Sequence, residues 1–117
     1  MRIKADDLDR KEFKESENYL IPREFIREEK YNKISSNAKI TYSILLSLVK
    51  KSAKLGNINS NNEIFLTVNR EKLMYMLNIK SNSTMVNIMK ELKDNNLIDE
   101  EKVGLGKVNK TYVHFIF

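Results

Sequence analysis

The chain has 117 residues, of which 41% are hydrophobic, a length and composition that fit one domain around a single core. Its formal net charge is +5, and residues 31–117 hold the whole excess: they carry 13 basic and 7 acidic side chains, whereas residues 1–30 carry 8 and 9. The absence of cysteine excludes disulfides, zinc–thiolate sites and thiol nucleophiles.

A basic surface attracts any polyanion, so the charge alone does not separate DNA from RNA or from an anionic membrane. No apolar run approaches the roughly 18 residues of a membrane-spanning helix. The residues after Met1 also lack the apolar stretch of a signal peptide. We therefore expect a soluble cytoplasmic protein.

Residues 1–18 are dense in charge and carry only three scattered large hydrophobic residues, Ile3, Leu8 and Phe13. So few apolar side chains do not hold a segment down by burial. We predict a mobile arm or a frayed helix over 1–18 and a single globular domain over 19–117. At the start of that domain, Pro22 suits the first position of a short helix that packs on the core.

A long helix is predicted from a cap at Ser35–Ser36 to Gly56. Its apolar residues recur at threes and fours, at Ala38, Thr41, Tyr42, Leu45, Leu48, Val49 and Ala53. Three more widen this stripe beyond what one core contact needs: Ile40, Ile44 and Leu55. The second surface on this helix is either the segment Tyr19–Ile26 of the same chain or a partner subunit, and Ile40 with Ile44 is then the candidate surface of a homodimer.

A polar loop over 57–62 precedes a strand over 64–68, in which alternating Ile64, Leu66 and Val68 predict one buried face. Two short helices follow. The first runs over 69–77 behind an Asn69 cap, with Leu73, Met76 and Leu77 facing inward.

The second helix runs over 82–94, after a tight turn, and is capped by Ser81 or Asn82. Its spacing predicts a buried stripe of Met85, Ile88, Met89 and Leu92. The opposite face carries Asn82, Ser83, Val86, Asn87, Lys90 and Lys93.

Two further strands, one from Leu97 and one over 110–117, meet around Gly104-Leu105-Gly106. The second is apolar on both faces, so both should be covered, and a chain ending on it indicates a domain cut from a longer protein. With the strand at 64–68 these make a three-stranded antiparallel sheet. The order of elements predicts an α+β, mainly helical fold, a winged helix-turn-helix.

This fold predicts contacts to a DNA duplex, because its second helix enters the major groove and its hairpin lies on the neighbouring backbone. Asn82, Ser83 and Thr84 are short polar residues where the backbone would lie closest to bases. Asn87, one turn further, could bond bidentately to adenine, which favours A·T-containing sites. The full predicted set is Lys80, Ser81, Asn82, Ser83, Thr84, Asn87, Lys90, Lys102, Lys107, Asn109 and Lys110. The plainer alternatives are a solvated amphipathic helix and a solvated hairpin.

Little in the sequence indicates catalysis, a metal or a cofactor. The single histidine, His114, lies among hydrophobic residues and is expected to be packed or hydrogen-bonded. Gly104-Leu105-Gly106 lacks the third glycine and the following helix of a dinucleotide site. The acidic run from Asp99 to Glu101 is expected to be exposed strand-turn charge. We therefore predict a protein that is not an enzyme.

From about Tyr19 to Tyr112 the chain resembles the N-terminal domain of the RepA family of plasmid replication initiators from Gram-positive bacteria. The resemblance rests on Ile21-Pro22 with Phe25, the run Tyr31 to Lys39 leading into the helix at Tyr42 to Leu48, Leu73 to Leu77, Thr84 with Lys90-Glu91-Leu92, Asn96-Leu97-Ile98, and Gly104-Leu105-Gly106-Lys107 with Asn109 and Tyr112. The run from Tyr31 to Lys39 and the glycine-lysine-asparagine-tyrosine wing are the more specific parts.

The resemblance implies a winged-helix domain that binds repeated sites at a plasmid origin, usually as a homodimer, so that host replication proteins are recruited. It places Thr84 in the recognition helix and Lys107 and Asn109 on the wing. Such proteins often have a tryptophan-containing loop where this chain has Asn57-Ile58-Asn59. The downstream domain expected to contact host proteins is missing here.

The predicted function is sequence-specific binding of double-stranded DNA at plasmid origin repeats to initiate replication. A transcriptional repressor with the same fold is one alternative, since a fold does not determine a biological role. A winged-helix protein-interaction module, whose polar helix docks on an acidic partner, is the other.

Overall fold

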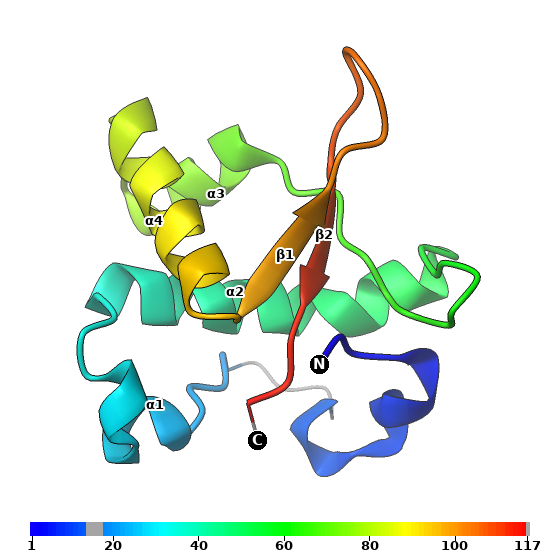
Figure 1. Cartoon of the computed structure of the whole chain (residues 1–117), viewed down its shortest axis with the longest axis horizontal. Coiled ribbons are helices and arrows are strands. Elements are labelled where there is room, and N and C mark those ends of the chain that lie inside the picture. The colour runs from blue at the N-terminus through cyan, green and yellow to red at the C-terminus, as the bar shows by residue number, and fades with distance from the viewer. Residues whose placement is uncertain (14–17, 117) are drawn as a thin grey trace.

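The structure is a computed structural model that describes residues 1–13 and 18–116. Its elements are the 3-10 helices η1 (Ala5–Asp9), η2 (Lys11–Phe13) and η3 (Glu29–Tyr31), the α-helices α1 (Glu24–Arg27), α2 (Ser36–Lys54), α3 (Arg70–Leu77) and α4 (Asn82–Asp94), and the strands β1 (Ile98–Glu101) and β2 (Lys110–Val113). Helix α2 crosses the middle of the molecule; α3, α4 and the hairpin lie on one side of it, and α1 and the N-terminal segment on the other (Figure 1).

Helix α2 forms the centre of the core. The Ser35 hydroxyl caps it by accepting a hydrogen bond from the Ala38 amide at 3.1 Å, and Gly56 ends it with φ +85°. Tyr42, near its middle, is fully buried and makes an edge-on contact with Phe25 of α1 at 5.2 Å between ring centroids. The Tyr42 hydroxyl donates to the His114 carbonyl at 2.6 Å, so the helix also holds the chain's last residues.

Of the three residues that widen the apolar stripe of α2, the chain itself buries only Ile44, and both Ile40 and Leu55 are exposed. Ile44 is buried in the same cluster as Phe25, whereas Ile40 is 43% exposed. The expectation that Ile40 and Ile44 form one open surface is therefore wrong for Ile44. The reason is that the N-terminal third supplies more buried side chains to this cluster than its composition suggested.

The N-terminal segment is packed on the domain over residues 1–13, where the sequence predicts a mobile arm or a frayed helix. Ile3 is fully buried and Phe13 nearly so. The Ile3 amide donates to the Val113 carbonyl at 3.1 Å, and the Ile3 carbonyl accepts from the Ile64 amide at 3.0 Å. Two hydrophobic side chains suffice here because backbone hydrogen bonds hold the segment as well. Residues 14–17 of the predicted arm lie outside the described residues.

The sheet among the described residues has two antiparallel strands, in register from Ile98 opposite Val113 to Glu101 opposite Lys110. The third strand predicted at 64–68 is reduced to a single bridge to the sheet, in which Leu66 and Thr111 exchange hydrogen bonds of 2.7 and 2.8 Å, while Ile64 forms a separate bridge with Ile58. Its neighbours bond elsewhere, since the Ile64 amide donates to Ile3 and the Phe65 amide to Asn57. Residues 111–113 of β2 are all buried, which confirms the predicted cover on both faces, but the strand ends at Val113, earlier than the predicted range of 110–117.

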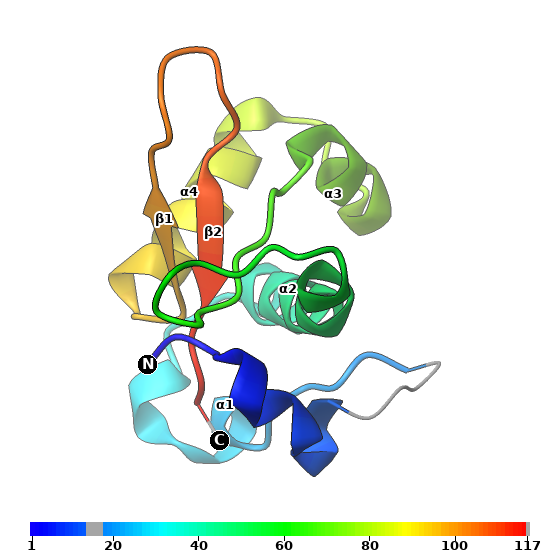
Figure 2. The ribbon, with the colours of Figure 1, turned by 90° about the vertical axis from the view of Figure 1, so that its right-hand side faces the viewer.

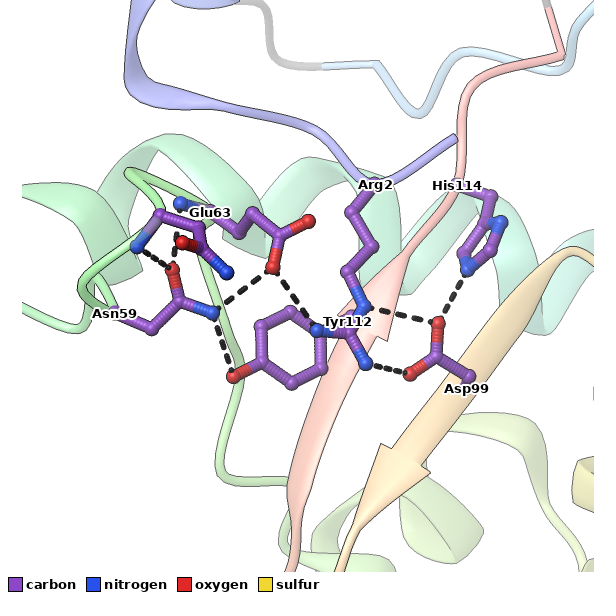
Figure 3. A network of polar contacts seen from close by, with 7 residues as sticks. Arg2, Asn59, Glu63, Asp99, Tyr112 and His114 are labelled. Atoms are coloured by element: carbon purple, nitrogen blue, oxygen red, sulfur yellow. Dashed lines mark hydrogen bonds and ion pairs between the residues drawn. The ribbon is translucent and has the colours of Figure 1, made fainter.

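Arg2 is the centre of a polar network that joins the N-terminus to the sheet (Figure 3). Its guanidinium lies 3.6 Å from the centroid of the Tyr112 ring and donates to Glu63 at 3.0 Å and to Asp99. Asp99 also bonds His114, so the prediction of a hydrogen-bonded histidine is confirmed. The expectation of a fully exposed acidic run is wrong for Asp99 and Glu100, which are both half-buried, because their partners, Arg2 for Asp99 and Lys93 for Glu100, lie outside the run.

This network should make stability sensitive to acid. The hydrogen bond from Asn59 and those from Arg2 hold the pKa of Glu63 below its ordinary value of 4.5. Burial raises the pKa of Asp99, but hydrogen bonds from Arg2 and His114 outweigh it, so this pKa lies below 3.8. A depressed pKa in the folded state means that the stabilisation is present above the ordinary pKa and is lost as pH falls below it.

Replacing Arg2 with glutamine should therefore lower the free energy of unfolding by about 1–2 kcal/mol at pH 7, since the pairs are only half-buried. The difference from the unmodified chain should shrink as the pH falls toward about 3, below the ordinary pKa values of both carboxyl groups. Urea unfolding at both pH values measures it, with the exposed Arg23→Gln as control. An equal loss at both pH values would rule out the carboxylate pairs as the cause.

Candidate nucleic-acid interface

Helices α3 and α4 are each set by a side-chain cap and separated by a sharp reversal. The Asn69 side chain accepts from the Lys72 amide at 3.0 Å, and the Ser81 hydroxyl accepts from the Thr84 amide at 3.4 Å. Between them Asn78 takes a left-handed conformation at φ +55°, which ends α3. Of the two caps predicted for α4, the structure therefore has Ser81.

Helix α4 divides into the two faces that its sequence predicts. The inward stripe, Met85, Ile88, Met89 and Leu92, is buried. The outward residues are exposed, among them Asn82, Ser83, Thr84, Val86, Asn87 and Lys90. On α3, by contrast, the predicted inward residue Met76 is 45% exposed, and Met74 packs against the core beside Leu73 and Leu77. This shift also leaves the neighbouring Tyr75 almost fully exposed.

The orientation of α4 is held at its C-terminal turn, which carries Glu91 and Lys93. The Glu91 carboxylate accepts hydrogen bonds from the Ser35 amide and, at 2.8 Å, from the Ser35 hydroxyl, which ties α4 to the start of α2. Near its C-terminus, Lys93 pairs with Glu100 of β1 at 2.6 Å. The outward face therefore has a defined position relative to the hairpin.

Replacing Glu91 with alanine should lower the free energy of unfolding by about 1–2 kcal/mol, because two charge-assisted hydrogen bonds are lost at a half-buried site. Asp94→Ala is the matched control on the same helix, since Asp94 is exposed; we expect it to change stability by less than about 0.5 kcal/mol. Urea unfolding of the two variants tests this directly. Equal stability of the pair would mean that Glu91 does not anchor the helix.

Glu100 bonds to side chains near the base of the hairpin. Its carboxylate accepts from the Asn109 side chain at 3.3 Å, in addition to the pair with Lys93. Burial raises the pKa of Glu100, but the bonds from Lys93 and Asn109 outweigh it and lower this pKa overall. Lys110 lies on the ring of Phe65, with its Nζ 4.5 Å from the ring centroid. The side chains of Asn109 and Lys110 are thus half-buried within the domain, whereas the other nine residues of the predicted set are exposed.

The loop 102–109 projects from the sheet toward the same side of the molecule as the N-terminal end of α4 (Figures 1 and 2). Lys102 and Lys107 on this loop are exposed, as is Lys80 in the turn before α4. A shallow groove beside that turn is lined by Tyr75, Lys80 and Asn82 among others. Nine of the eleven predicted residues are exposed: Lys80, Ser81, Asn82, Ser83, Thr84, Asn87, Lys90, Lys102 and Lys107.

Two exposed features of this surface are absent from the sequence prediction: Tyr75 of α3 and the leucine at the hairpin tip, Leu105. The helical spacing around Leu73 and Leu77 would have placed Tyr75 outside the buried stripe. Elsewhere in the described ranges, no group of three His, Asp or Glu residues is arranged to hold a metal ion, and no helix there is long and apolar enough to cross a membrane.

Comparisons with known proteins agree with this architecture. Three solved structures each match 84% of this chain. A structure described as the N-terminal domain of a DNA-binding protein has a TM-score of 0.75 at 30% identity over 74% of its own chain. A Rep–DNA complex has 0.74 at 31% over 75%, and an MDR initiator 0.72 at 26% over 76%. No curated protein matches significantly. The family model described as the replication initiator protein A (RepA) N-terminus matches residues 17–117, and the chain belongs to that family.

Proposed function

We propose that this domain binds double-stranded DNA sequence-specifically at repeated sites in a plasmid origin and so initiates replication. The observation that carries the proposal is the juxtaposition of two exposed features. The N-terminal end of α4 presents Asn82, Ser83 and Thr84, and a hairpin bearing Lys102 and Lys107 projects on the same side. Family membership and the similarity to a Rep–DNA complex support it.

In this proposal α3, α4 and the hairpin form a winged helix, and Leu66, bridged to Thr111, stands for its third strand. Helix α4 enters the major groove, where Asn87 is the side chain that can bond bidentately to adenine. Short polar residues at its start contact bases, and exposed lysines contact phosphates, which fix the register without reading sequence. The domain acts by binding, and no residue is assigned a catalytic role.

Binding at repeated origin sites would involve protein partners as well as DNA. We propose that the domain works as a homodimer, so that two copies occupy paired sites, and that a further domain contacts host replication proteins. Charge supports a polyanionic ligand such as DNA, because the excess of basic side chains lies within residues 31–117.

Selection of bound duplexes from a random library gives the test. The selected site should survive excess unspecific competitor DNA in a mobility-shift assay, because only base contacts discriminate against a large excess of other sites. Direct repeats of the selected site beside the coding region would support an initiator. Complete competition by unspecific DNA would contradict sequence-specific binding.

A further inference from the structure

The tip of the hairpin is apolar, although it projects furthest into solvent. Leu105 is 105% exposed, and Val108 and Val103 on the two arms are 61% and 45% exposed. Single exposed hydrophobic residues are ordinary. Here three exposed hydrophobic residues lie within six residues of a projecting loop. The exposed side chains of Lys102 and Lys107 flank them, so the tip is apolar and its flanks are basic.

The shape of the tip is narrow. The Lys107 amide donates to the Gly104 carbonyl at 3.2 Å, which closes a tight turn with Leu105 at its apex. Gly106 has φ +74°, a conformation that glycine adopts without strain, and a Cβ placed there would meet nothing within 4 Å. Because both flanking residues are glycines, the Leu105 side chain is the only side chain at the apex of this turn.

A minor groove is about 6 Å wide and 7.5 Å deep, so a turn with a single side chain at its apex is the part of the hairpin suited to enter it. A loop with four residues on each arm reaches up to about 13 Å beyond the last strand pair. The slim apex can therefore reach the groove floor, while lysines on both arms meet the phosphates along its walls. A broader tip, with side chains on both sides of the leucine, would be too wide for the groove.

An apolar side chain on the groove floor distinguishes base pairs by the space they leave. A G·C pair places the guanine N2 amino group in the minor groove, whereas an A·T pair presents only acceptors there. The amino group would occupy the space of a leucine side chain and would lose hydration without gaining a partner. The narrow groove of A·T-rich DNA also attracts lysines.

We propose that Leu105 enters the minor groove beside the site that α4 reads, and that it selects A·T over G·C pairs there. This inference rests on the proposed function. It adds a specificity-determining residue outside α4, one that carries no hydrogen-bonding group. A protein partner for the same apolar tip is the competing assignment, and the experiment separates the two.

The experiment divides the DNA on each side of the selected site into blocks of two base pairs. Each block in turn is made A·T, G·C or inosine·C, and the three duplexes are compared. Inosine lacks the N2 amino group, so inosine·C resembles G·C in the major groove and A·T in the minor groove. The unmodified protein should bind the A·T and inosine·C duplexes alike and the G·C duplex about tenfold more weakly at one block. Leu105→Ala should reduce this ratio to about twofold, and Leu105→Met should preserve most of it, because methionine keeps the apolar volume.

Three results would overturn the inference while leaving the proposed function intact: an unchanged ratio in Leu105→Ala, an inosine·C duplex that binds like G·C, or a loss of self-association in Leu105→Ala without a change in DNA affinity. If the unmodified protein selects no duplex at all, the proposed function fails first. Circular dichroism and the unfolding midpoint of Leu105→Ala should match those of the unmodified chain, since the side chain is fully exposed.

Discussion

Replacing Ile3 with alanine should lower the free energy of unfolding by about 2–4 kcal/mol. The side chain is fully buried, and the same residue bonds through its backbone to both Val113 and Ile64. Truncation at this position leaves a cavity between the N-terminal segment and the sheet, and it loosens the neighbouring Arg2, which pairs with Asp99. Urea unfolding followed by circular dichroism measures the change.

The matched control is Ile26→Ala, the same truncation at a residue that is 78% exposed. We expect this control to stay within about 0.5 kcal/mol of the unmodified chain. If the free energy of unfolding falls equally little in both variants, residues 1–13 are not part of the core, and a mobile arm is the better description.

Replacing Asn87 with alanine should cost about 1–3 kcal/mol of discrimination between the selected site and a site mutated at one adenine. Asn87 is exposed on the outward face of α4, one turn beyond the capped start of the helix. Its carboxamide offers both a donor and an acceptor, which an adenine edge requires in the major groove. Competition titrations against the two sites measure the change in ratio, and stability should be unaffected.

Two other substitutions serve as comparison variants for Asn87→Ala. Asn32→Ala removes an exposed carboxamide next to η3, away from the proposed interface, and should leave binding unchanged. Lys107→Ala should weaken binding to all duplexes alike and reduce the salt slope by about one, since a phosphate contact carries no sequence information. A loss of affinity in Asn87→Ala that is equal for both sites would place Asn87 on the backbone instead of a base.

The helices could be predicted from sequence because their signals are local. A cap and a repeat at threes and fours place the ends of α2, α3 and α4 within a few residues. The inward stripe of α4 followed from spacing alone, and so did its outward face. Where the local signal was weaker, as on the eight-residue α3, Met76 was assigned to the wrong side.

The remaining features depend on residues distant in the chain. Burial of Ile3 requires Val113 and Ile64, and the half-buried state of Asp99 depends on Arg2, 97 positions away. The strand at 64–68 shrinks to a bridge because its amides bond to Ile3, Asn57 and Thr111 in turn. In the candidate site, the pairing of Asn109 with Glu100 and the contact of Lys110 with Phe65 were not predictable for the same reason.

NMR spectra of the ¹⁵N-labelled chain, recorded during titration with the selected duplex, locate the DNA-binding surface. We expect amide resonances of Ser81–Asn87 in α4 and of Lys102–Lys107 in the hairpin to shift together, while those of α1 and η3, on the far side of α2, stay in place. Shifts confined to α1 and the N-terminal segment, with α4 and the hairpin unchanged, would contradict this prediction.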